Sequence, residues 1–86
     1  MIYAIVAGQE ADALGEVIRT QYPDHHQFPP SCWFVVDALS AEDISRKLGI
    51  ANGAIRGVQA VVIPVTSYYG YAPGDLWTWL QKRWPG

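Results

Sequence analysis

Three short segments of this chain are apolar at adjacent positions, and this constrains the fold more than any other feature. They are Ile2–Ala7, 31–38 and 58–65. Successive side chains of a strand point to opposite faces, so each segment predicts a strand with apolar residues on both faces. The adjacent pairs are Ile5 and Val6, Phe34 and Val35, and Val61 and Val62. A sheet built from these strands needs cover on both faces.

Two segments between the strands have the periodicity of amphipathic helices. Residues 10–21 and 40–48 repeat apolar side chains every three or four positions. These positions are Leu14, Val17 and Ile18 in the first segment and Ala41, Ile44 and Leu48 in the second. Ser40 is typical of an N-cap, and Gly49 suits the C-terminal end. We therefore predict one helix in each segment.

The remaining segments complete the element order. His25–Phe28 predicts a short strand. Pro29-Pro30 predicts a turn, since proline is excluded from central strands. Residues 75–84 predict a terminal helix. The order is strand, helix, strand, strand, helix, strand, helix. We predict a single α+β domain over 1–86, with a ferredoxin-like βαββαβ antiparallel sheet and an additional C-terminal helix.

The composition favours association with a second copy. Half of the residues are apolar and 16% are charged, and small domains often bury such an excess by oligomerising. Eight acidic residues outnumber six basic ones, the opposite of a general nucleic-acid binder. The one cysteine forms no internal disulfide and fits the cytoplasm. The apolar N-terminus is too short for a signal peptide or membrane span, so we expect no membrane association.

Little in the sequence predicts catalysis or a bound metal. His25 and His26 are adjacent on a strand and point to opposite faces, so they are poorly placed to chelate one ion. Cys32 lies on an apolar strand, which indicates core packing. Asp37 fits two interpretations equally well, a metal ligand or polarity at a helix entry before Ser40. No hydrolase or phosphate-loop motif is present. We predict no catalytic, cofactor-binding or metal-binding residue.

The segment 67–84 holds three tyrosines and three tryptophans. On a helix that begins at Asp75, the predicted inward positions are Leu76, Trp77, Leu80 and Trp84. Trp79 lies off this stripe, where Arg83 can stack on its ring. An extended tyrosine run precedes the helix. We predict that part of this segment closes a two-fold dimer over the sheet; the predicted interface residues are Tyr68, Tyr69, Tyr71 and Trp79.

Three segments carry a resemblance to a known group: "MIYAIVAG", "SCWFVVDALSAEDISRKL" and "GDLWTWLQKRW". The chain resembles small ferredoxin-like proteins related to the CRISPR-associated endonuclease of spacer acquisition, and SinR-like proteins found near toxin–antitoxin genes. The resemblance implies a dimer and, in catalytic members, a metal-binding aspartate that ends the first strand. Ala7, Gly8 and Gln9 stand there. None offers a carboxylate ligand, so nuclease activity is not expected.

These observations predict a non-catalytic homodimeric binding or assembly protein, associated through the resemblance with a toxin–antitoxin or CRISPR-type system. One alternative is a metal-dependent endoribonuclease that uses a relocated carboxylate, such as Asp37 or Glu10. A second is a small-ligand sensor. Binding of single-stranded nucleic acid is a minor alternative. Aromatic rings and two basic doublets, Arg46-Lys47 and Lys82-Arg83, favour it, but the acidic total charge opposes it.

Overall fold

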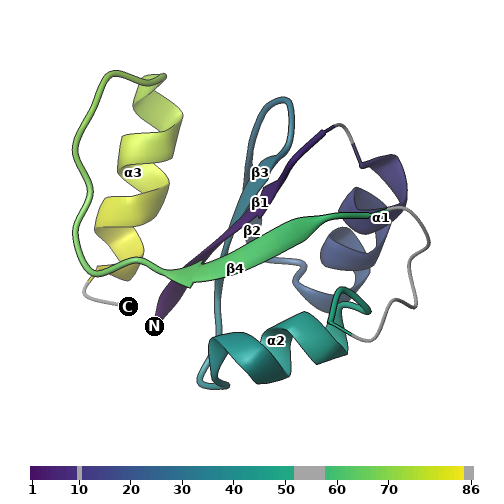
Figure 1. The fold of residues 1–86 in the computed structure, drawn as a ribbon. Coiled ribbons are helices and arrows are strands. Elements are labelled where there is room, and N and C mark those ends of the chain that lie inside the picture. Colours follow the sequence, from purple (N-terminus) through teal and green to yellow (C-terminus); the bar gives the residue numbers. More distant parts are fainter. Residues whose placement is uncertain (10, 52–57, 85–86) are drawn as a thin grey trace.

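The computed structural model describes residues 1–9, 11–51 and 58–84. Within these residues the chain forms an α+β fold with a four-stranded antiparallel sheet and three helices, as predicted (Figure 1). The elements are β1 (Ile2–Ala7), α1 (Asp12–Gln21), β2 (His25–Phe28), β3 (Cys32–Val36), α2 (Ala41–Lys47), β4 (Ala60–Pro64) and α3 (Gly74–Arg83).

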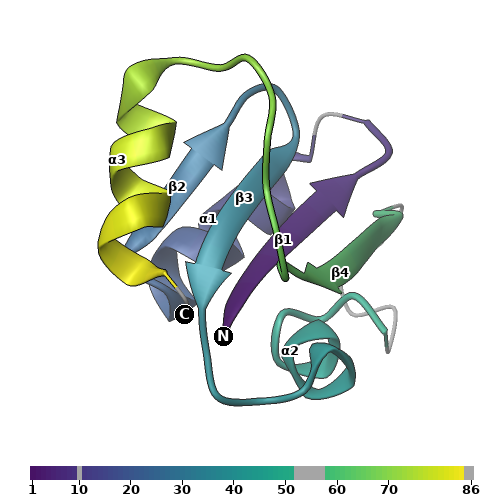
Figure 2. The same cartoon turned by 90° about the vertical axis from the view of Figure 1, so that its left-hand side faces the viewer.

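The strands lie in the order β2-β3-β1-β4, and each pair of neighbours is antiparallel. β1 is therefore central, with Ile5 opposite Trp33 of β3 and Val62 of β4. Helices α1 and α2 lie on one side of the sheet and α3 on the other (Figures 1 and 2). The predicted pairing of the first and last strands is confirmed.

The two sides of the sheet form separate apolar cores. The first lies beneath α1 and α2, and its fully buried aliphatic members are Ile5, Leu14, Ile18, Val35, Ile44 and Leu48. The second is smaller and joins β1 to α3 through Ile2, Leu76, Trp79 and Leu80. Both faces thus receive cover, as the apolar strands require, but α3 gives much less of it than the helix pair.

The capping residues in the sequence predicted the ends of α2 correctly. Ser40 accepts a hydrogen bond from the backbone N–H of Asp43 at 3.1 Å, which confirms it as the N-cap. Gly49 has a φ of 82° and ends the helix, a conformation that favours glycine. The strands β3 and β4 are each shorter than the predicted 31–38 and 58–65.

The outer edge of the sheet at β4 ends in Pro64. The backbone N–H of Val65 donates to Ile2 O, and that of Gly8 donates to Gln59 O, each at 2.9 Å. Hydrogen-bonding positions alternate along an antiparallel pair, so the nitrogen of Pro64 faces away from β1. Proline is tolerated there because no N–H is needed. It also hinders pairing of this edge with another strand.

Among the described residues, no helix combines the length and apolar character needed to cross a membrane.

Candidate interaction surface

Helix α3 presents a different side to the sheet from the one predicted. Leu76, Trp79 and Leu80 are buried, whereas Trp84 is 37% exposed. The predictions that Trp79 stays available for a partner and that Trp84 belongs to the core are therefore wrong. Trp77 is half-buried against the second core, and Leu80 is inward as expected. The inward residues follow the i, i+3, i+4 spacing of a helix face, rotated toward Trp79.

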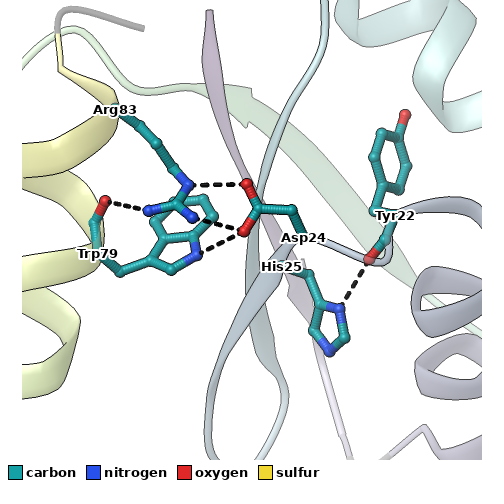
Figure 3. Close-up of polar contacts among 5 residues, drawn as sticks. All are labelled: Tyr22, Asp24, His25, Trp79 and Arg83. Atoms are coloured by element: carbon teal, nitrogen blue, oxygen red, sulfur yellow. Dashed lines mark hydrogen bonds and ion pairs between the residues drawn. The ribbon is translucent and has the colours of Figure 1, made fainter.

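Asp24, which precedes β2, explains this rotation. The Nε and Nη2 of Arg83 donate to the two Asp24 carboxylate oxygens at 2.9 and 2.6 Å (Figure 3). Trp79 Nε1 donates to the same carboxylate at 3.3 Å. The guanidinium carbon of Arg83 lies 4.2 Å from the Trp79 ring centroid, so the predicted stacking is confirmed. A bidentate pair of this kind fixes orientation as well as adding energy, and Asp24 therefore anchors α3 on β2.

The anchor makes α3 docking dependent on pH. Hydrogen bonding by Arg83 holds the pKa of the Asp24 carboxyl below its usual value. A carboxyl with a lowered folded-state pKa stabilises the fold above its unfolded pKa of about 3.9 and loses that contribution as the pH falls through the folded value. We expect Arg83→Met to raise the pKa of Asp24 toward about 3.9, measured by carboxyl NMR titration.

The matched control for this titration is Arg46→Met. Arg46 pairs with Glu42 on α2, so its removal should leave Asp24 unchanged. An Asp24 pKa that is the same in Arg83→Met and in the wild type would contradict the assignment.

Asp37, the carboxylate proposed for a relocated metal site, is held by structural contacts. It accepts from Tyr22 OH at 2.6 Å and from the Leu39 N–H at 3.1 Å, and Lys47 Nζ lies 3.5 Å away. Burial would raise the pKa of the Asp37 carboxyl, but these donors and the Lys47 charge together lower it. Burial and the Asp37 charge raise the pKa of Tyr22. The cluster joins α1, β3 and α2.

The other sequence candidates are dispersed. His25 Nδ1 lies 2.7 Å from Tyr22 O (Figure 3), while His26 packs against Trp79 with ring centroids 6.0 Å apart. Cys32 is only half-buried, which differs from the predicted core packing. Its partial burial raises the pKa of the thiol. Glu10 lies outside the described residues. Within the described ranges, no three metal-ligating side chains come together.

An apolar strip remains uncovered on the α3 side of the sheet. Val6 of β1 stands directly opposite Val61 of β4, and Ile63 follows two residues along. These three side chains are 38%, 54% and 48% exposed. We call them the β4 strip. α3 lies against β2 at the other edge of the sheet and leaves this half open (Figure 2).

The segment from residue 65 to residue 73 crosses the sheet between β4 and α3 (Figure 2), and we call it the strap. Tyr68 packs inward, stacked on Trp77 at a centroid distance of 5.8 Å and edge-on to Trp84 at 5.0 Å. Tyr69 and Tyr71 are fully exposed. Of the four predicted interface residues, two are thus open to a partner, Tyr68 is half-buried and Trp79 is buried.

The uncovered strip and the strap share a lack of charge. From residue 58 to residue 74 the sequence contains no Asp, Glu, Lys or Arg.

No family model, curated protein or solved structure matches this chain. Its function must therefore be inferred from this surface and its chemistry.

Proposed function

We propose that the chain is a non-catalytic homodimeric binding or assembly protein that pairs through the β4 strip. The observation that carries the proposal is the exposure of Val6, Val61 and Ile63 side by side on one face of the sheet. Grouped apolar side chains of this kind mark interaction sites on small proteins. Subunit interfaces of homodimers are also more apolar than the surrounding surface.

The absence of charge suits this surface to a second copy, and Pro64 bears on how the two copies pack. A two-fold axis brings the same patch of both subunits together, so an uncharged patch packs against an identical patch without like-charge repulsion. The absence of charge from residue 58 to residue 74 satisfies that condition. Pro64 hinders extension of the sheet across the β4 edge. We therefore propose face-to-face packing of the two sheets.

We also propose the finer fold assignment, a ferredoxin-like arrangement. The insertion of β3 between β1 and β2, with a helix in each crossover on the same side, supports a split βαβ topology. The sequence resemblance leads us to propose an association with toxin–antitoxin or CRISPR-type systems. The single cysteine leads us to propose a cytoplasmic location. The roles of Tyr69 and Tyr71 at the dimer stay predictions.

Sedimentation of a double variant tests the dimer. We expect the wild type to be dimeric at micromolar concentration and Val61→Lys/Ile63→Lys to weaken the dimer about 100-fold, because lysines would meet across the two-fold axis. Both positions are about half exposed, so the protomer should still fold, as circular dichroism can verify.

Two further variants define the interface. Leu39→Lys is the matched control, because Leu39 is similarly exposed but lies between β3 and α2; it should remain dimeric. A monomeric wild type refutes the dimer, and a dimer unaffected by the two lysines refutes the β4 strip as its interface. Tyr69→Ala/Tyr71→Ala shows whether the tyrosines take part.

A further inference from the structure

Helix α3 occupies its site on the sheet in the way that a ligand helix occupies a groove. It contributes Leu76, Trp79 and Leu80 to the second core, and Arg83 forms the bidentate pair with Asp24. The four helical positions follow the i, i+3, i+4, i+7 pattern by which an amphipathic helix binds another protein. The sheet of a second copy carries an identical site and offers α3 the same contacts.

The strap leaves α3 free to dock elsewhere. Within the part of the chain that the structure describes, no backbone–backbone hydrogen bond involves residues 66–72. Tyr68 packs on Trp77 and Trp84, which belong to the same C-terminal segment. Val65, by contrast, still donates to β1. A hinge directly after Val65 therefore lets the strap and α3 move together without loss of a backbone hydrogen bond.

The position of α3 restricts the two-fold axis of the dimer proposed above. Helix α3 lies on the same face of the sheet as the β4 strip, but at the opposite edge (Figure 2). Packed sheets lie about 10 Å apart, which is also about the diameter of a helix with its side chains. The helix therefore leaves no room for the partner's sheet above β2. An axis above the β4 strip, parallel to the strands, avoids this collision.

This axis places two docking sites for α3 equally near the end of β4. In the strand order β2-β3-β1-β4, the site on the same chain lies three interstrand spacings away, or about 14 Å. The axis places the partner's site at the same spacing on the other side of β4. The strap, from residue 65 to residue 73, extends to about 30 Å at most. It can therefore deliver α3 to either site.

The small size of the β4 strip favours the partner's site. The strip consists of three partly exposed side chains, whereas a stable dimer buries about 800 Å² on each partner. If α3 docks on the partner, the second core becomes part of the interface, and its buried members are Ile2, Leu76, Trp79 and Leu80. Exchange of an identical element reuses contacts that the fold already makes and needs no new complementary surface.

We propose that the two subunits exchange α3, so that each helix docks on the other sheet and Arg83 pairs with Asp24 of the partner subunit. The proposal rests on the dimer of the β4 strip and names the element that locks it. The β4 strip brings the two copies together. The exchanged helices then hold them, because dissociation requires both helices to undock.

Charge reversal distinguishes exchange from docking within one chain. Asp24→Arg and Arg83→Asp each place like charges in the docking site of a single chain, so α3 should lose protection from hydrogen exchange in either variant alone. In a mixed dimer with exchanged helices, Arg83 of the first variant meets Asp24 of the second. When ¹⁵N-labelled Asp24→Arg is mixed with unlabelled Arg83→Asp, the labelled amides of 74–83 should become at least about tenfold better protected.

Two controls accompany the mixing experiment. Unlabelled Asp24→Arg, added in place of Arg83→Asp, offers no complementary site and should leave the protection unchanged. The double variant Asp24→Arg/Arg83→Asp should recover protection without mixing, because opposite charges again face each other. Protection of the amides that pair β1 with β3 verifies that each variant keeps the remainder of the fold.

The wild type provides an independent measurement. In an equimolar mixture of ¹³C-labelled and unlabelled chains, isotope-filtered NMR detects contacts between chains, and we expect one between the methyl groups of Leu80 and Ile2. If the dimer is weakened by Val61→Lys/Ile63→Lys but shows neither this contact nor a gain of protection on mixing, the exchange is overturned and the β4 strip stands. If mixing restores protection but the two lysines leave the dimer unaffected, the exchange is supported and the strip is refuted.

Discussion

Leu80→Ala is expected to release α3 from the sheet while the remainder of the fold stays intact. Leu80 is 1% exposed and belongs to the small core that also contains Ile2, Leu76 and Trp79. Truncation of a buried leucine to alanine costs about 2–5 kcal/mol. The strap adds only partly buried residues, such as Tyr68 and Ala72, to this small core, and the larger core beneath α1 and α2 has separate members. The free energy of opening α3 should therefore fall more than that of the sheet.

Hydrogen exchange measures this difference directly. In Leu80→Ala, the amides of 74–83 should exchange at least tenfold faster, while those that pair β1 with β3 keep most of their protection. Thr78→Ala is the matched control on the same helix, because Thr78 is exposed and its hydroxyl donates within the helix, to Gly74 O. Equal loss of protection in α3 and β1 would show that the two cores unfold as one unit.

Gly15→Leu is expected to destabilise the whole domain by about 3 kcal/mol, at the upper end of the usual cost of overpacking a core. Gly15 is buried in α1, where the helix approaches the ring of Trp33 on β3. A Cβ atom at this position would lie 3.3 Å from Trp33 Cζ2, and a leucine places further atoms in the same space. Urea unfolding of the variant and wild type provides the measurement.

Gly15→Ala separates the steric effect from the helical one. Alanine gains about 1 kcal/mol of helix propensity over glycine, and its single methyl group meets Trp33 at a distance that needs only a small adjustment. The two effects oppose each other, so we expect a change within about 1 kcal/mol. If Gly15→Leu is as stable as Gly15→Ala, the close approach of α1 to Trp33 does not limit the packing.

The sequence by itself determined the elements of this protein, because their signals are local. Apolar runs set three of the four strands, and Pro29-Pro30 delimited the fourth, His25–Phe28. The three-to-four residue period set the helices, and Ser40 and Gly49 marked the ends of α2. Hydrogen bonding and side-chain direction within a few residues cause these patterns. The sequence also indicated an excess of apolar surface, which the exposed β4 strip reflects.

Only the tertiary structure decided how α3 is turned and which aromatic rings stay exposed. A helical wheel placed Trp84 inward and Trp79 outward, since it counts apolar residues and ignores what they meet. The bonds from Trp79 and Arg83 to Asp24 span 55 and 59 residues, so no local pattern reveals them. The strap crosses the sheet because β4 lies at one edge while α3 packs against β2 at the other, and Tyr69 and Tyr71 of this strap are left in solvent.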